Sequence, residues 1–247
     1  MDENISNKAF LLAIGSLRDF LDIKTSEKQL SITFKLHPAV KDVIEAQGIP
    51  HTAVFKVDIN GTKQSLTYNL RDGDRIVLYP FEAVENNECE PIYVRPKTFI
   101  GDVHLGKLVR TLRLLGLDTT FNSNWNEQTI IKRSNAKQRM ILTRDLELLQ
   151  HGQTQYGYWI RATNPSRQVE ELFERFELTP YLNPFTRCMK CNGVLRQTDL
   201  EPVKEQVPPK VQEWHSTYWQ CSICQKVYWK GSHYKKLQQR VKELRNR

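Results

Sequence analysis

Apolar and β-branched residues along the first third of the chain predict a small unit that combines strands with one helix. The segments AFLLAIGSL (9–17) and SITFKLH (31–37) have the composition of strands. A proline opens the segment 38–48, its apolar residues recur with a period of about 3.6, and a glycine ends it, which predicts a helix. The segment AVFKVDI (53–59) precedes an Asn-Gly pair, a strong hairpin signal, and RDGDRIVLYPF (71–81) adds a last turn and strand. The predicted order is therefore β-β-α-β-β-β.

Strand and helix patterns alternate along the next part of the chain, up to the first pair of cysteines. The acidic, turn-rich segment EAVENNECEP (82–91) separates this part from the first, and we expect a linker over 85–96. The predicted strands lie at 98–102, 139–143 and 158–162, and the predicted helices lie at 104–116, at 124–137 and from Asn164 onward. Such alternation predicts a parallel sheet whose strands are connected by helices.

The charge is divided unevenly between these parts. Residues 1–90 hold 10 Lys and Arg against 14 Asp and Glu, a net charge of −4, whereas residues 91–247 hold 26 against 14, a net charge of +12. A strongly basic unit favours a polyanion as its partner, above all nucleic acid. The alternative is a basic protein whose lysines are merely solvated.

The overall composition is that of an ordinary globular protein, with 39% hydrophobic and 26% charged residues among 247. The longest apolar runs are far shorter than the roughly 20 residues that a helix needs to span a bilayer. The first ten residues, MDENISNKAF, contain acids and no apolar signal core. We therefore expect a cytoplasmic protein with no membrane partner.

Four of the five cysteines form two C-x-x-C pairs, Cys188 with Cys191 and Cys221 with Cys224. Two such turns can present four thiolates to one tetrahedral ion, which predicts a zinc site. Because four cysteines leave no position open for water, the predicted zinc is structural. A four-cysteine iron–sulfur site and a dithiol redox pair are the alternatives. Cys89 stands alone, and we expect it to be a loop thiol.

Basic and aromatic residues surround the second cysteine pair. Residues 230–247 hold seven Lys and Arg against one Glu, next to several Trp and Tyr, and such neighbours can stack bases and hold phosphates. A basic stripe also falls opposite the leucines of the predicted helix 104–116. The candidate RNA-binding residues are Lys107, Arg110, Arg113, Trp229, Lys230, Lys235 and Lys236. The alternative for the C-terminal segment is that its tryptophans pack a small core and its helix is only solvated.

Acidic residues follow two of the predicted buried strands. Asp102 comes directly after TFIG, and Asp145 follows MILT and one arginine. Ligand sites in open α/β sheets gather at the carboxyl ends of strands, where Glu127 at a helix start and Asp118 before a further strand could join them. A cluster of carboxylates suits Mg²⁺ or Mn²⁺, which can activate water and stabilise the leaving oxygen in phosphodiester cleavage. Each acid alone could instead be a helix cap or a turn residue.

Several of these stretches closely resemble the Mut-seven C-terminal RNase family. The resemblance rests on FIGDVHLGKLVRTLRLLGLDTT, RMILTRDLELL, PFTRCMKCNGVL and CSICQKVYWKGSHYKKL, in this order over about residues 97–237. It implies a PIN-like nuclease fold that ends in a zinc ribbon. The stretches VKDVIEAQGIPH and LRDGDRIVLYPFE resemble the ubiquitin-like β-grasp module that often precedes this nuclease.

The resemblance also implies a role for the acids. PIN-like nucleases cleave RNA with a divalent metal held by three or four acids. In this chain those acids are Asp102, Asp118, Glu127 and Asp145. Members of the family often carry aspartates before the helix that starts at Glu127, whereas this chain has Asn124 and Asn126 there. Arg144, beside Asp145, is expected either to contact the scissile phosphate or to orient the acids through an ion pair.

We therefore expect an α/β protein with four segments: a ubiquitin-like β-grasp module at 1–84, a linker at 85–96, a PIN-like nuclease domain at 97–180, and a zinc ribbon with a basic tail at 181–247. The expected function is a metal-dependent ribonuclease that hydrolyses RNA phosphodiester bonds with Mg²⁺ or Mn²⁺. The alternative is a non-catalytic protein that binds RNA or the ribosome.

The expected partners are RNA, with the ribosome and tRNA among the candidates, and an unidentified protein that binds the β-grasp module. This module is also similar to the sulfur carriers of thiamin and molybdopterin synthesis. Those carriers end in a free Gly-Gly, which is absent here. The sequence therefore favours an interaction module over sulfur transfer.

Overall fold

The computed structural model describes residues 6–21, 29–84, 96–232 and 234–245. By its contacts the chain divides into two compact units, Met1–Arg95 with Asp145–Trp159, and Pro96–Arg144 with Ile160–Arg247. Most of the predicted linker 85–96, Cys89 included, falls outside the described residues. Every helix within the described ranges is too short or too polar to cross a membrane.

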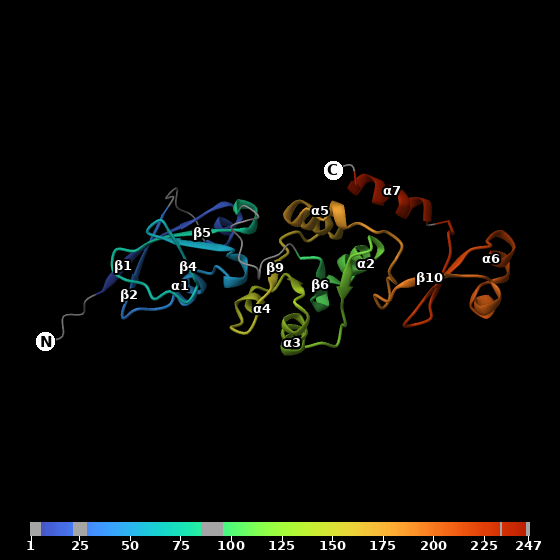
Figure 1. Cartoon of the computed structure of the whole chain (residues 1–247), viewed down its shortest axis with the longest axis horizontal. Coiled ribbons are helices and arrows are strands. Elements are labelled where there is room, and N and C mark those ends of the chain that lie inside the picture. The colour runs from blue at the N-terminus through green and yellow to red at the C-terminus, as the bar shows by residue number, and fades with distance from the viewer. Residues whose placement is uncertain (1–5, 22–28, 85–95, 233, 246–247) are drawn as a thin grey trace. The chain divides into compact units, whose positions relative to one another are not determined.

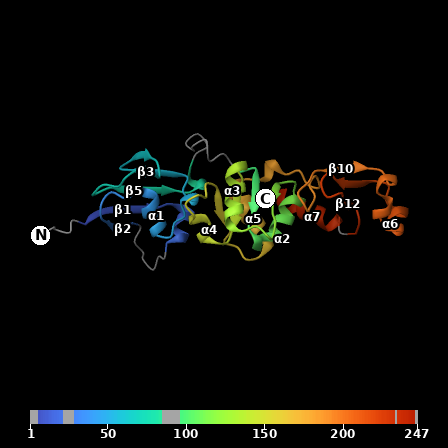
Figure 2. The same ribbon diagram turned by 90° about the horizontal axis from the view of Figure 1, so that it is seen from below.

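The first unit is built on a five-stranded sheet with the order β2-β1-β5-β3-β4 (Figures 1 and 2). Its strands are β1 (Asn7–Ala13), β2 (Leu30–Phe34), β3 (Lys56–Ile59), β4 (Thr62–Gln64) and β5 (Arg75–Tyr79). β1 runs parallel to β5 and antiparallel to β2, while β3 runs antiparallel to both β4 and β5. The helix α1 (Val40–Ala46) packs its buried valines and isoleucine into the same core as the strands. The predicted β-β-α-β-β-β order and the ubiquitin-like β-grasp fold are confirmed.

The hairpin between β3 and β4 shows why a local signal could predict part of this fold. Asn60 and Gly61 have φ angles of 55° and 80°, so both adopt the left-handed conformation that a two-residue hairpin turn needs. Ile59 pairs with Thr62 directly across this turn. Two neighbouring residues therefore fix both the turn type and the register of the strands.

The segment after Asp145 belongs to the first unit by its contacts. It holds α4 (Leu146–Gln150) and β9 (Gly157–Trp159). His51, in the 3₁₀ helix η2 (His51–Ala53), donates from Nε2 to the Thr154 carbonyl at 2.6 Å, and the Phe20 and Trp159 rings lie 5.1 Å apart. Among its described residues the first unit also has the 3₁₀ helices η1 (Gly15–Phe20) and η3 (Phe81–Ala83). The domain limits expected from the sequence remain a proposal.

The second unit contains the parallel strands of the predicted α/β domain. β6 (Thr98–Gly101) lies between β7 (Asp118–Thr120) and β8 (Met140–Thr143) and runs parallel to both. The connections are η5 (Val103–Leu105) with α2 (Gly106–Leu114), and then α3 (Glu127–Lys137). Because such crossovers are right-handed, and the chain turns from one side of β6 to the other, α2 and α3 cover opposite faces. The strand order thus reverses between β6 and β8, the place where open α/β sheets bind ligands.

Two further helical segments follow in this unit. α5 (Pro165–Phe176) is capped by Asn164, as expected from the sequence, and packs against α2 (Figure 1). The 3₁₀ helix η6 (Thr179–Tyr181) then leads to the cysteine region.

The cysteine region folds as a small antiparallel sheet with the order β10-β11-β12 (Figure 2). Its strands are β10 (Leu195–Thr198), β11 (Tyr218–Cys221) and β12 (Val227–Tyr228). Between β10 and β11 the chain forms η7 (Glu201–Gln206) and α6 (Pro209–Trp214), and after β12 it ends in α7 (Tyr234–Arg245). Val203, Val207, Tyr218 and Val227 make a core of their own for this ribbon.

Candidate functional site

Asp102 stands at the carboxyl end of β6, where its side chain is held in one orientation. Its backbone N–H continues the ladder to β8 by donating to Leu142 at 2.9 Å. Its Oδ1 accepts from the Val103 N–H at 2.5 Å, and its Oδ2 accepts from the Thr143 hydroxyl at 2.9 Å. The residue is only 7% exposed. Within the described residues no cation pairs with this carboxylate, so its charge is buried but not neutralised.

Three other predicted site residues stand at the same end of the strands by chain order. Arg144 and Asp145 directly follow β8, and Glu127 is the first residue of α3, which runs back from the carboxyl edge to the start of β8. Arg144 and Glu127 are exposed. Asp145 caps α4 by accepting from the Glu147 N–H at 2.9 Å. α3 begins at Glu127 and not at residue 124 as predicted, and its cap is Asn126, whose side chain accepts from the Thr129 N–H at 3.0 Å.

Asp118 lies at the opposite edge of the sheet. It is the first residue of β7 and pairs with Thr98, the first residue of β6, whereas Asp102 follows the last. Four residues of strand separate the two positions, which is about 13 Å at 3.3 Å per residue. The strand begins at this acid, as the sequence suggested, but its parallel register with β6 puts it at the other edge, so the structure does not bring Asp118 to Asp102.

The surroundings of Asp118 also differ from those of Asp102. Arg139 donates to its Oδ1 at 2.6 Å, the Asn192 amide donates to the same oxygen at 2.8 Å, and Arg187 lies 3.4 Å from its Oδ2. Burial alone would raise the pKa of Asp118, but these hydrogen bonds and charges hold that pKa below its ordinary value. Asp118 is a compensated structural acid that joins the sheet to the first cysteine turn.

Arg113 has a similar structural role, which its helical position did not reveal. It is only 3% exposed, and its guanidinium donates to the carbonyls of Thr119, Met189 and Lys190 at 2.8, 3.2 and 2.8 Å. The sequence placed it on a solvent-facing basic stripe with Lys107 and Arg110, but the cysteine turn covers it. Lys107 and Arg110 are exposed, so they alone keep the position expected of RNA-binding residues on α2.

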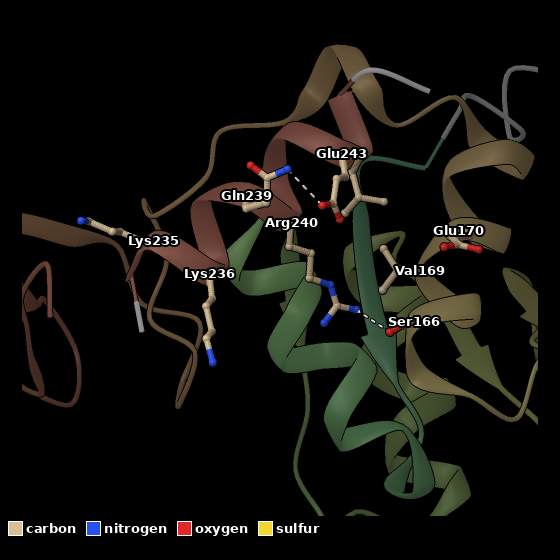
Figure 3. Close-up of a pocket in the computed structure, with 9 residues that line it drawn as sticks. Ser166, Val169, Glu170, Lys235, Lys236, Gln239, Arg240 and Glu243 are labelled. Carbon is tan, nitrogen blue, oxygen red and sulfur yellow. Dashed lines mark hydrogen bonds between the residues drawn. The ribbon is translucent and has the colours of Figure 1, made fainter. Parts of the chain in front are cut away.

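The basic residues expected near the C-terminus are mostly on the surface. Lys230, Lys235 and Lys236 are exposed, and Figure 3 shows the last two projecting from α7 away from Arg240 and Glu243. Trp229 is half-buried and packs against the ribbon core, so the alternative expectation that the tryptophans fill a small core fits this residue.

The four cysteines of the two C-x-x-C pairs converge at one point. Their sulfur atoms lie within 4.8 Å of one another, with Cys191 and Cys221 at 3.3 Å and Cys188 and Cys224 at 3.6 Å. All four are free thiols. In the described ranges this is the one group of three or more His, Cys, Asp or Glu that converges in this way, and the predicted acids do not form a second one.

The cysteine turns shift the acidity of their own thiols. Burial would raise the pKa of Cys188, but hydrogen bonds from the Tyr228 hydroxyl at 3.1 Å and from the turn's backbone lower that pKa to about 6. Burial raises the pKa of Cys191 to about 12. Four thiolates this close repel one another, so a cation at their centre is needed to keep all of them ionised.

The structure identifies site residues that the sequence did not single out. Thr143 is the hydroxyl that orients Asp102, and its only sequence signal is a polar residue at the end of a buried strand. Arg139, Arg187 and Asn192 surround Asp118, but two of them come about 70 residues later in the chain. Contacts over such separations leave no periodic pattern in the sequence.

Some solved structures are similar to about a third of the chain. They are SAMP1 from Haloferax volcanii (12% identity, TM-score 0.25, covering 30% of this chain and 94% of that one), a putative molybdopterin converting factor subunit 1 from Pyrococcus furiosus (18%, 0.25, 30% and 97%) and the Haloferax volcanii HVO 2177 protein (16%, 0.28, 35% and 92%). The comparison with curated proteins gives no match.

The comparison with protein families gives a clear result for both parts of the chain. The model described as the Mut7-C RNAse domain matches residues 97–241, more than half of the chain, and the model described as Mut7-C ubiquitin matches residues 6–85. These are the same stretches on which the sequence resemblance rests. The chain therefore belongs to the Mut7-C RNase family and carries the Mut7-C ubiquitin module before its RNase domain.

Proposed function

We propose that the RNase domain hydrolyses RNA phosphodiester bonds with Mg²⁺ or Mn²⁺ bound at the carboxyl edge of β6. The observation that carries this proposal is the buried, oriented carboxylate of Asp102, which has no cationic partner among the described residues. Burying a carboxylate without a cationic partner costs free energy, which its two hydrogen bonds offset only in part. A hard divalent cation, which prefers oxygen ligands, would supply the missing charge.

The proposed ligand set is smaller than the sequence suggested. Each Asp102 oxygen accepts one hydrogen bond from the protein, which leaves lone pairs for a metal. Glu127 is the proposed further ligand because it follows the carboxyl end of β7 in chain order. Asp145 is left out because its segment groups with the first unit. Asp118 is left out, since Arg139 and Arg187 already compensate its charge at the other edge.

Each residue at this edge has a separate part in the proposed reaction. Asp102 binds the metal, and Thr143 holds the carboxylate in place. The exposed Arg144 contacts the scissile phosphate, and the exposed Lys107 and Arg110 of α2 attract the RNA backbone. The metal, when bound, makes water a better nucleophile and stabilises the leaving oxygen.

We also propose that the four cysteines hold a structural zinc ion. Zinc with bonds of about 2.3 Å to four sulfurs in a tetrahedron spaces them about 3.8 Å apart. The observed limit of 4.8 Å and the two pairs at 3.3 and 3.6 Å fit this arrangement. The metal would fix the cysteine turns that bond to Arg113 and Asp118, and so hold the ribbon to the sheet.

The test of the nuclease is cleavage of structured and unstructured RNAs by the full chain with added Mn²⁺ or Mg²⁺. Asp102→Asn keeps the shape of the side chain and removes the charged ligand, so we expect cleavage to fall by at least about 100-fold. Asp199→Asn is the matched control, because Asp199 is an exposed aspartate on the ribbon. It should cleave like the wild type.

Two results would contradict this proposal in different ways. If the wild type cleaves and Asp102→Asn cleaves equally well, the carboxylate does not hold a catalytic metal. If the wild type binds RNA but cleaves none with either metal, the alternative of a non-catalytic RNA-binding protein is the better account. Binding of the RNA, measured in parallel, separates the two.

A further inference from the structure

A pocket of about 690 Å³ opens beside the ribbon sheet, between β11, β12 and α7. Its volume is within the range of about 300–1,000 Å³ that is usual for small-molecule sites. The residues that matter here are Phe185, Trp219, Tyr228, Lys230 and Tyr234, and all of them lie in the second unit. None is assigned to the metal edge or to the cysteine centre as a ligand.

One side of this pocket is formed by a cross-strand aromatic pair. Trp219 on β11 stands directly opposite Tyr228 on β12, so both side chains project from the same face of the sheet. The Tyr228 hydroxyl contacts the Cys188 sulfur at 3.1 Å, which fixes its ring. Both residues are half-buried, which leaves part of each ring open to the pocket.

The other side is a second aromatic pair. The rings of Phe185 and Tyr234 lie 4.8 Å apart at an angle of 42°. Phe185 precedes the first cysteine turn, and Tyr234 begins α7, so two separate elements hold these rings. The pocket therefore offers preformed flat apolar surfaces on two sides.

Cations stand over these rings. Lys230 Nζ lies 5.5 Å from the centre of the Trp219 ring and 5.6 Å from that of Tyr234, and Lys226 Nζ lies 5.5 Å from that of Tyr228. At an exposed site such a contact is worth only about 0.5–1 kcal/mol, so the ammonium groups can move off the rings at small cost. Among the described residues that line the pocket, three are cationic and none is acidic.

A second groove, between α5 and α7, does not share these properties. Figure 3 shows Arg240 bonded to Ser166 and Gln239 bonded to Glu243, with Glu170 also at its edge. The groove is lined by three cations and two carboxylates and offers no aromatic ring. It therefore has no flat apolar surface on which a base could stack.

We propose that the aromatic pocket binds an unpaired base of single-stranded RNA. The base stacks on Trp219 or Tyr234 in place of Lys230, and Lys226 and Lys230 then contact the phosphates on either side of it. A base within a duplex is already stacked and cannot enter. An apolar peptide would leave these lysines without anionic partners. The proposal rests on RNA as the substrate of the domain and specifies which RNA it selects.

The aromatic pocket and the proposed metal site at Asp102 lie at different places in the second unit. The pocket reaches Leu114, the last residue of α2, near the edge where β7 begins. Asp102 stands at the other edge, and β6 alone spans about 13 Å between them. The bound base therefore does not lie at the bond that is cleaved but is separated from it along the RNA strand.

The test measures binding of a labelled single-stranded RNA of about ten nucleotides to the full chain carrying Asp102→Asn, so that cleavage cannot interfere. Stacking on one aromatic side chain is worth about 1–3 kcal/mol, so Trp219→Ala and Tyr234→Ala should each raise the Kd by roughly 5- to 150-fold. Tyr234→Phe should bind normally. Trp214→Ala is the matched control, because Trp214 is 80% exposed on α6, outside the pocket.

A second, independent test changes the RNA instead of the protein. Replacing nucleotides one at a time by abasic units removes the base and keeps the phosphates, and we expect a loss of affinity comparable to that of Tyr234→Ala at one position. The metal content of each variant, measured by elemental analysis, shows that the ribbon is intact. Unchanged affinity of both alanine variants, or equally tight binding of a fully duplex RNA, would overturn the proposal.

The outcomes separate this proposal from the nuclease proposal. Suppose that wild-type cleavage depends on Asp102 but that RNA affinity is the same for the pocket variants and for RNAs with abasic units. The pocket proposal is then wrong, and the nuclease proposal is supported. If binding depends on the pocket but neither metal supports cleavage by the wild type, the nuclease proposal falls and the pocket stands.

Discussion

The Thr143 hydroxyl donates a hydrogen bond to Oδ2 of Asp102 at 2.9 Å, and both side chains are buried. The bond joins the ends of β8 and β6, the two strands between which the strand order reverses. It fixes the direction in which the remaining lone pairs of Asp102 point. In the proposed site, Thr143 is therefore a positioning residue that acts through Asp102.

This relationship predicts the effect of removing the hydroxyl. Thr143→Val keeps the shape and β-branching of the side chain but leaves Asp102 Oδ2 without its donor. Outer partners of metal ligands are typically worth about 10–100-fold in metal affinity or activity, so we expect a loss of this size. The measurement is the cleavage rate as Mn²⁺ is titrated, in which half-saturation should shift to higher Mn²⁺. Thr143→Ser keeps a hydroxyl and should retain most of the cleavage rate. If Thr143→Ser cleaves as slowly as Thr143→Val, the hydroxyl does not position Asp102.

Asp118 leads to a prediction about stability and pH. Its folded-state pKa is lowered below the ordinary 3.8, because hydrogen bonds from Arg139 and Asn192 outweigh burial. A group whose pKa is lower in the folded state stabilises the protein above its unfolded pKa, and this contribution is lost as the pH falls through the folded value. Near neutral pH, the free energy of unfolding of the wild type should therefore be larger than that of Asp118→Asn by about 1–3 kcal/mol.

The measurement is urea unfolding of both proteins from about pH 7 down to about pH 3, where the difference in unfolding free energy should shrink. The wild type and Asp118→Asn contain the same cysteines, so protonation of these thiols at low pH should affect both proteins alike and cancel in the difference. A difference that stays constant across this range would show that the charge of Asp118 is not what stabilises the wild type.

The contrast between Asp118 and Asp102 shows what could be predicted from the sequence. The β-grasp order, the Asn60-Gly61 turn and the cap at Asn164 depend on residues close together in the chain, and all three are found. The two C-x-x-C pairs also converge. The spacing within each pair is local and marks both as metal-ligand turns, and four such ligands predict one shared site.

Predictions that depended on distant contacts were less accurate. The sequence placed Asp118 before a further strand, but it did not show that the parallel pairing of β7 with β6 puts this acid at the opposite edge from Asp102. Arg113 lay on the polar side of its helix, but the turn at Met189 and Lys190, some 76 residues later, covers it. The grouping of residues 145–159 with the first unit likewise arises from contacts such as His51 with Thr154. No pattern within a short window of sequence carries this information.

The cysteine centre predicts one zinc ion per chain. Cys191→Ser should lose the metal and lower the melting temperature, since zinc binding in such sites contributes directly to folding. Cys89→Ser is the matched control, because Cys89 is the one cysteine outside the two C-x-x-C pairs. Elemental analysis and thermal unfolding are the measurements, before and after a strong chelator. Iron in place of zinc, or no bound metal in the wild type, would contradict this prediction.

The last prediction separates two basic residues of α2 that look equivalent in the sequence. Lys107 is exposed, so Lys107→Ala should weaken RNA binding, and the slope of log Kd against log salt should fall by about 0.7 for one lost phosphate contact. The melting temperature of Lys107→Ala should equal that of the wild type. Arg113 is buried and donates to three carbonyls, so Arg113→Met leaves them without donors, at about 1–3 kcal/mol for each acceptor left unsatisfied.

Arg113→Met should therefore lower the melting temperature markedly, whatever RNA is present, and any loss of RNA affinity should follow the loss of folded protein. Salt titrations of RNA binding and thermal unfolding of both variants give the two readouts. Lys107 and Arg113 share one helix and the same charge sign but differ in burial, so the two readouts should separate an RNA contact from a structural role. Arg113→Met with a normal melting temperature but a reduced salt slope would place Arg113 on the RNA after all, and would require the first cysteine turn to move away from α2.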